Sequence, residues 1–333
     1  MLLALFAGTL LVVTTACSSA PESAEKGAPI TLKVGSQPTI SSGNLYVAMA
    51  KGYFADEGIT VEIVEGMSTD AQTLVATKQL DAYFGSLAAS YFNGVANGLD
   101  VTLAGEIGQI AEDKRPNIEL LVRKDGPIKT VADLRGKKIS IPSGPDSSTG
   151  WMVDLLLRQA GLSLNDVEVL KLGPSDGVAA LLNDSVAATI SYYPLLVSLL
   201  EKGDIVALDG MSEAYSNSAN AFSIGPSLTI DNRDAGVRFL RALYRAVDDL
   251  KGDYLQDPEI SKIISDATQI PIETVRKSPS PAYHKNLPLN AKSLNALQDF
   301  FRSRGVLKYP TNLSIEELSD QALMDEAAKS LTH

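Results

Sequence analysis

The stretch that decides the fold reads NLYVAMAKGYFADEG at residues 44–58 and continues directly as ITVEIV at residues 59–64. We expect a helix over residues 45–54 that ends near Gly58, and the apolar–polar alternation of 59–64 predicts a strand. A short strand at residues 32–34 and a loop rich in Ser and Gly at residues 35–44 precede the helix. Strand, loop, helix and strand in this order form a βαβ unit, which implies a parallel sheet.

The same order of elements returns about one hundred residues later. Residues 138–141 read as a strand, 143–150 as a polar loop, 151–160 as a helix and 167–170 as the next strand. In addition, residues 70–86 align without gaps on residues 176–192, and each segment is a helical pattern that runs into a short strand. The repeat predicts two similar α/β lobes.

The chain is expected to cross between the lobes twice, at residues 120–124 and 221–226. The first lobe would then comprise residues 30–122 and 225–333, and the second lobe residues 123–224. Two strand-like crossings form a hinge, and closure about a hinge is a common way to enclose a ligand. The residues after Ile230 are mostly helical, and we expect them to support the first lobe.

These segments resemble the substrate-binding proteins of ABC importers for nitrate, sulfonates, taurine and thiamine precursors. The resemblance rests on residues 44–62, on Leu80-Asp81-Ala82, on residues 133–139 (DLRGKKI), and on residues 159–162 and 166–167. It implies an α/β type II periplasmic-binding-protein fold, a small-molecule ligand, no catalysis and no cofactor. It also implies a permease and an ATPase as partners; we further expect a monomer.

The N-terminus has the pattern of an export signal. Residues 1–13 are almost wholly apolar, and Thr14-Thr15-Ala16 precede Cys17, which is similar to a bacterial lipobox. We therefore expect a signal peptide at 1–16, a lipid on Cys17, and a polar tether at 17–29 that holds the protein at the membrane, facing the periplasm or the cell exterior. Residues 2–16 lack Lys and Arg, and Thr14 departs from the motif, so a plain secretory signal with an incidental cysteine is the alternative.

Composition excludes several classes of site. The formal net charge is −11, with 40 acidic and 29 basic residues, which argues against nucleic acid as a partner. One cysteine and two histidines leave almost no ligands for a zinc site, and we expect no metal.

Four loops at the carboxyl ends of expected strands form the candidate binding site, because ligands of open parallel sheets bind there. They are residues 35–44, 85–90, 142–150 and 191–194. Three consecutive hydroxyls precede the helix at 151–160, where one caps the helix and the others can face a ligand. The candidate ligand-binding residues are Gln37, Ser42, Asn44, Ser86, Glu106, Ser147, Ser148, Thr149, Trp151, Tyr192 and Tyr193.

Each candidate also has a structural explanation. Asn44 is placed to cap a helix, Trp151 to fill a core or a rim, and Glu106 to lie in solvent. None of the four loops contains Lys or Arg, whereas Tyr46, Tyr83, Phe84 and three of the candidates give six aromatic residues in or beside them. We therefore expect a flat heterocycle such as a thiamine precursor or a flavin, with a sulfonate, taurine or nitrate as the alternative.

A serine esterase is the alternative of another class. Residues 173–177 (GPSDG) match the G-x-S-x-G pattern between a strand and a helix, with Ser175 as the nucleophile. Such an enzyme requires a histidine, and His284 and His333 are the two that follow Ser175 in sequence.

Overall fold

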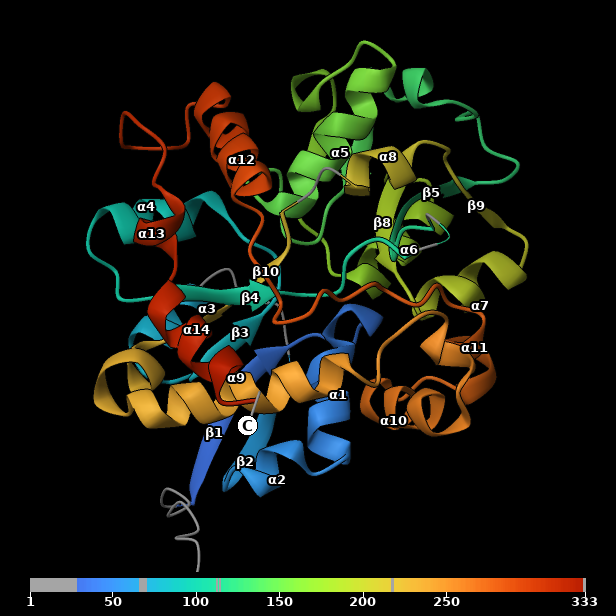
Figure 1. Ribbon diagram of the computed structural model, residues 1–333. Helices are drawn as coiled ribbons and strands as arrows, with labels where there is room; N and C mark the ends of the chain where they lie inside the picture. Colours follow the sequence, from blue (N-terminus) through green and yellow to red (C-terminus); the bar gives the residue numbers. More distant parts are fainter. Residues whose placement is uncertain (1–28, 66–70, 112, 114, 217–218, 332–333) are drawn as a thin grey trace, which may run out of the picture.

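The computed structural model describes residues 29–65, 71–111, 113, 115–216 and 219–331. Two five-stranded sheets, each flanked by helices, form two lobes (Figure 1). The expected signal peptide, Cys17 and all but the last residue of the tether lie outside the described residues. Within those residues, no helix combines the length and the apolar character needed to span a membrane.

The two sheets have equivalent strand orders. The first is ordered β2 (Ile59–Glu65), β1 (Ile30–Ser36), β3 (Ala82–Phe84), β10 (Ala221–Ile224) and β4 (Thr102–Glu106). The second is ordered β7 (Glu168–Leu170), β6 (Lys138–Ser140), β8 (Ala188–Tyr192), β5 (Ile118–Arg123) and β9 (Ile205–Ala207). In each sheet the first three strands are parallel and the fourth is antiparallel to the third. Because β3 and β8 begin 106 residues apart, the repeat expected from the sequence is present in the fold.

The fourth strand of each sheet is formed by the segment that directly follows the crossing from the other lobe. β5 follows β4 in sequence but pairs with β8 and β9 in the second sheet, and β10 follows β9 but pairs with β3 and β4 in the first. The boundaries expected after Val122 and after Ile224 are therefore wrong. The crossings lie earlier, between Glu106 and Ile118 and between Ala207 and Ala221, because both crossing strands belong wholly to the sheets that they enter.

Helices cover both sheets. Those of the first lobe are α1 (Gly43–Ala50), α2 (Tyr53–Asp56), α3 (Ala71–Ala76), α4 (Ala89–Ala96), α9 (Arg233–Val247), α10 (Pro258–Thr268), α11 (Ile272–Arg276) and α14 (Gln321–Lys329). Those of the second lobe are α5 (Ser148–Gln159), α6 (Pro174–Leu182), α7 (Leu195–Glu201) and α8 (Met211–Ser216). Two more, α12 (Ala291–Ser303) and α13 (Ile315–Leu318), lie in the C-terminal segment.

The longest helix, α9, shows how the first lobe is held together. Asn232 caps its start by accepting a hydrogen bond from the Ala235 N–H at 3.0 Å. Phe239, Leu240 and Leu243 are fully buried, and the Phe239 ring stacks on Phe54 with ring centroids 5.3 Å apart. Burial of each such side chain contributes about 1.5–3 kcal/mol, so this apolar face fixes α9 to the lobe.

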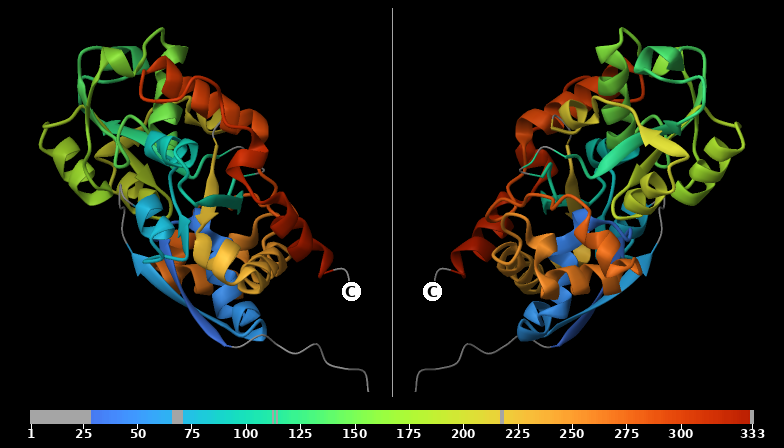
Figure 2. Two further views of the ribbon diagram at one scale, coloured as in Figure 1. Left: turned by 90° about the vertical axis from the view of Figure 1, so that its left-hand side faces the viewer. Right: turned by 90° about the vertical axis from the view of Figure 1, so that its right-hand side faces the viewer.

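The C-terminal segment contacts both lobes rather than the first lobe alone. In α12, Phe301 lies 5.8 Å from Phe92 of α4, and Phe300 lies 6.5 Å from Trp151 of α5. Arg304 forms an ion pair with Asp146 of the second lobe at 2.8 Å. Figure 2 shows this segment, coloured orange to red, lying along one side of both lobes.

Candidate ligand-binding cleft

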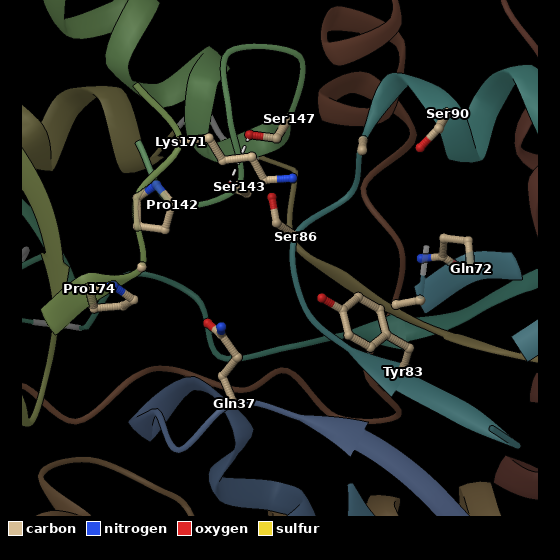
Figure 3. Close-up of a pocket in the computed structure, with 13 residues that line it drawn as sticks. Gln37, Gln72, Tyr83, Ser86, Ser90, Pro142, Ser143, Ser147, Lys171 and Pro174 are labelled. Carbon is tan, nitrogen blue, oxygen red and sulfur yellow. Dashed lines mark hydrogen bonds between the residues drawn. The ribbon is translucent and has the colours of Figure 1, made fainter. Parts of the chain in front are cut away.

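The carboxyl ends of the strands of both sheets face a cleft between the lobes. Three cavities lie there, of about 410, 60 and 290 Å³, and each is lined by residues of both lobes. Gln37, in the loop after β1, lines all three cavities, so they lie next to one another around this side chain. Figure 3 shows the largest, with Tyr83 and Gln72 on one wall, Lys171, Pro142 and Pro174 on the other, and Gln37 extending into it from the first lobe.

The hydroxyl-rich start of α5 forms part of the cleft wall. Ser147 caps the helix by accepting a hydrogen bond from the Gly150 N–H at 3.0 Å. A Cβ at Gly150 would lie 2.2 Å from the carbonyl oxygen of Pro145, so only glycine fits at this turn. Ser148 and Thr149 line the smallest cavity, as the sequence led us to expect of two of the three hydroxyls.

The start of α5 is also held in place by the first lobe. The Ser148 N–H donates to the Leu87 carbonyl at 2.7 Å, and the Ala89 N–H donates to the Asp146 carbonyl at 3.0 Å. The hydroxyl of Ser86 lies 2.8 Å from that of Ser148. Two elements 60 residues apart in sequence are thereby joined across the cleft by main-chain and side-chain hydrogen bonds.

Three tyrosines contribute hydroxyl and ring surface to the cleft. Tyr83 lines the largest cavity, Tyr193 lines the cavity of about 290 Å³, and Tyr192 lines that cavity and the smallest one. Burial raises the pKa of Tyr83 and of Tyr192 to about 12, so both hydroxyls stay protonated at neutral pH and can donate hydrogen bonds. Gly85 allows this arrangement, because a Cβ there would lie 2.3 Å from the Tyr83 hydroxyl.

Lys171 is a cleft residue that the sequence analysis missed. It follows β7 and lines the largest cavity, where Figure 3 shows its ammonium group extending into the space near Ser86. Among the described residues that line the three cavities it is the only charged side chain. The signal was present, since β7 is a parallel strand and its carboxyl end opens on the same edge as β6.

Other lining residues were missed for a similar reason. Ala71 and Gln72 begin α3, and Gly173 and Pro174 precede or begin α6, the two helices that the repeat relates. Ser143 lies inside an expected loop but was not selected.

Two of the candidate residues, Trp151 and Glu106, do not line the cavities and contact C-terminal residues instead. Trp151 has 6% of its surface exposed and packs against Phe300, so it serves the contact between α5 and α12. Glu106 accepts a hydrogen bond from the His284 N–H at 2.8 Å, and its carboxylate lies 2.6 Å from His284 Nδ1. Burial raises the pKa of the Glu106 carboxyl, and its contacts with His284 act in the opposite direction.

The candidates in the first loop divide between cleft and core. Gln37 and Ser42 line cavities, and Ser42 also accepts a hydrogen bond from the Ser36 hydroxyl at 3.1 Å. Asn44 is fully buried within α1, and neither its amide nitrogen nor its amide oxygen has a hydrogen-bond partner. Tyr46, counted as an aromatic near the site, directs its hydroxyl to the Gln37 carbonyl at 2.7 Å and lines a separate groove.

The esterase motif does not form a catalytic pair with His284. Ser175 lies in the first turn of α6 and lines the cavity of about 290 Å³. It makes no hydrogen bond to His284, whose ring nitrogen is paired with Glu106 instead. A nucleophilic serine needs a hydrogen-bonded base, so this arrangement does not support the esterase.

Similar proteins are consistent with this geometry. A binding protein of Brucella abortus (strain 2308) is 27% identical over 206 residues, which cover 58% of this chain and 62% of the relative. The chain thus matches less than two thirds of that relative's length. The riboflavin-binding protein RibY of Chloroflexus aurantiacus is 28% identical over 257 residues, covering 72% of this chain and 71% of RibY.

Solved structures share the fold. The alkanesulfonate-binding protein SsuA from Xanthomonas axonopodis pv. citri, bound to MOPS, superposes with a TM-score of 0.70 and 20% identity, covering 88% of this chain and 99% of SsuA. The expected fold, an α/β periplasmic-binding-protein fold of two lobes, is thereby confirmed. The family model described as NMT1/THI5 like matches residues 39–258, well over half of the sequence. The chain therefore belongs to the NMT1/THI5-like family.

Proposed function

We propose that this protein is an extracytoplasmic solute-binding lipoprotein that delivers a small organic molecule to an ABC importer. The observation that carries the proposal is the cleft: its cavities are lined by polar and aromatic side chains from both lobes, and two chain crossings connect those lobes. A site shared between two lobes favours a ligand that is enclosed and later released when the lobes part. The partners would be a permease and an ATPase.

The relatives support this role. RibY is named for riboflavin and the Xanthomonas protein for alkanesulfonates, so the fold and the family include proteins that bind small organic molecules. The desulfurization enzyme DSZB has the same fold with a TM-score of 0.62 and 14% identity, and the fold by itself does not exclude catalysis. What disfavours catalysis here is the site: within the described residues, which include His284 but not His333, Ser175 has no histidine partner, and Glu106 is paired with His284.

Attachment to a membrane rests on residues 1–17 of the sequence. If Cys17 is lipidated, the protein made in a bacterial host will partition into a detergent phase, and Cys17→Ser will move it to the aqueous phase. A protein that stays aqueous in both forms would favour the plain secretory signal.

The ligand that we favour is a flat heterocycle, such as a thiamine precursor or a flavin. Tyr83, Tyr192 and Tyr193 in the cavity walls support it, because aromatic rings offer large flat contact surfaces. A sulfonate, taurine or nitrate is the second candidate.

A thermal-shift and calorimetric screen tests the function. Riboflavin, hydroxymethylpyrimidine, taurine, nitrate and alkanesulfonates should include at least one compound that binds one to one, raises the melting temperature and is not converted. Ser86→Trp fills the largest cavity and should abolish that binding. Ser185→Trp, at an exposed groove on the far side of the second lobe, is the matched control and should bind normally. Turnover of a compound, or binding that survives Ser86→Trp, would contradict the proposal.

A further inference from the structure

The largest of the three cleft cavities holds polar side chains that make no polar contacts of their own within the described part of the protein. The side chains of Gln37, Tyr83, Ser90 and Lys171 all line it, and none makes a hydrogen bond or ion pair with the described residues. They come from both lobes. Tyr83 is buried, Gln37 is half-buried, and Ser90 and Lys171 are exposed to solvent, so these polar groups are free to bind a ligand that enters the cavity.

The charge of the side chains that line this cavity indicates which kind of ligand it binds. Lys171 contributes a positive charge, and no described lining residue contributes a negative one. The whole chain carries a formal charge of −11, so its general field repels anions. An ammonium group without a counter-ion at the ligand site therefore favours a ligand that brings an anionic, acceptor-rich group to it.

The cavity of about 290 Å³ has a different character. It contains no charged residue among those described, and its walls include Pro38, Tyr192, Tyr193, Leu195 and Ile270. These side chains offer aromatic and aliphatic surface to a flat or apolar group. Gln37 and Pro174 line both cavities, so the two are neighbours, and a ligand that spans both would run beside these side chains.

We propose that the ligand is an elongated molecule with an anionic end, bound by Lys171 in the larger cavity, and a flat apolar end, bound between Tyr193 and Ile270 in the other. The inference rests on the proposed function and narrows its ligand class. It places bare small anions second, because nitrate or taurine would occupy only the Lys171 end. It also adds an anionic group to the flat heterocycle that we favoured, a preference that rested on four loops without Lys or Arg.

Matched pairs of compounds test the anionic end. Riboflavin and flavin mononucleotide differ by a phosphate, and naphthalene-2-sulfonamide and naphthalene-2-sulfonate differ by a charge at nearly constant shape. By calorimetry, the anionic member of at least one pair should bind roughly ten- to hundred-fold more tightly, as expected for hydrogen bonds to a charged group. Lys171→Met should remove that advantage and leave the neutral member within about two-fold, and Lys171→Arg should restore much of it.

Two further variants separate the ends of the site. Ile270→Ser should weaken both members of a pair by a similar factor, because it changes only the apolar cavity. Lys138→Met, an exposed lysine at the amino end of β6, is the charge-matched control and should change neither.

The outcomes separate the inference of a two-ended ligand from the proposed solute-binding function on which it rests. Equal affinity within every pair, or an equal loss for both members in Lys171→Met, overturns the two-ended ligand. If taurine or nitrate alone binds, and Ser86→Trp blocks it, the receptor function stands and the two-ended ligand is wrong. If no compound of the pairs or of the screen binds, both proposals fail.

Discussion

The two lobes share one strand order, yet they differ in how the N-terminus of the first cleft-wall helix, α1 or α5, is held in place. In the second lobe α5 is capped from within by Ser147, three residues before Gly150. In the first lobe the side chain of Ser42, the N-cap residue of α1, makes no capping hydrogen bond. Instead, the Gly43 N–H donates at 2.9 Å to the hydroxyl of Tyr283, which lies 240 residues further along the chain. The repeat thus conserves the topology, while the side-chain cap of α5 is local and the start of α1 is held by a tyrosine far away in sequence.

The largest effect is expected from a methyl group at the start of α5. Gly150→Ala would place Cβ 2.2 Å from the Pro145 carbonyl oxygen, a main-chain atom that cannot move without its loop. We expect the free energy of unfolding to fall by about 3 kcal/mol, the upper end for overpacking, and ligand binding to weaken as Ser148 shifts. Urea titration measures the first and calorimetry the second.

Gly43→Ala is the matched change in the first lobe. Its Cβ would meet the Tyr283 hydroxyl at 3.1 Å, the tip of a side chain. We expect Gly43→Ala to lower the free energy of unfolding by less than about 1 kcal/mol, because alanine also favours the helix. Equal losses in the two variants would mean that the two helix starts are constrained alike.

A smaller difference in stability is expected between matched variants of α6 and α3, the two helices that correspond in the repeat. Gly177 corresponds to Ala71, 106 residues earlier, and a Cβ on Gly177 would lie 2.4 Å from the Thr189 hydroxyl oxygen. Gly177→Ala should destabilise the protein by about 1–2 kcal/mol through overpacking against β8. Ala71→Gly, the reverse change in the first lobe, should cost about 0.5–1 kcal/mol from helix entropy, and its buried methyl group is lost as well. A thermal melt in which Gly177→Ala gains stability would show that α6 has room to spare.

The two caps can be compared directly by removing one hydroxyl from each. Tyr283→Phe takes the acceptor from the Gly43 N–H and also the donor to the Ser41 carbonyl, so about 2 kcal/mol of stability should be lost. Ser147→Ala removes one local cap and should cost about 1 kcal/mol. Chemical denaturation of the two variants and of their double mutant measures both; a larger loss from Ser147→Ala would reverse the assignment of which wall relies on distant residues.

The smallest effect concerns the two crossing strands, because β5 carries a half-buried carboxyl group, Glu119, and β10 carries none. Burial, and to a lesser degree the nearby Asp209, raises the pKa of Glu119 in β5 to about 8 from 4.5. The folded state therefore keeps this proton between pH 4.5 and 8 while the unfolded state loses it, so stability falls as pH rises through that range. Glu119→Gln should flatten this decline, melt a few °C higher than the unaltered protein at pH 9 and match it near pH 4. Parallel pH profiles for the two proteins would contradict the raised pKa.

Much of the architecture could be predicted from the sequence, because local patterns of apolar and polar residues determine it. The alternation at residues 59–64 and the repeat of 70–86 at 176–192 both correspond to observed elements. The two crossing strands were recognised as strands but given to the wrong lobe. Which sheet a strand joins depends on partners far away in sequence, and no local pattern in β5 or β10 records them.

The site was predictable only where a loop directly follows a recognised strand. The hydroxyls at 147–149 and the residues Ser86 and Tyr192 are in the cleft for that reason. Trp151 was misplaced because the loop does not reveal which way the first turn of a helix faces, and its partner Phe300 lies in the C-terminal segment. Glu106 was misplaced because His284 approaches it from 178 residues further along the chain.

The exchange of crossing strands sets the order in which the lobes can be finished during synthesis. β10 lies between β3 and β4 in the first sheet, so that sheet has a gap in its middle until residue 224 has emerged. The second sheet has all five strands once residue 207 is out. The lobe that starts first is therefore closed last, and until then it exposes two unpaired strand edges to any chaperone or neighbouring chain.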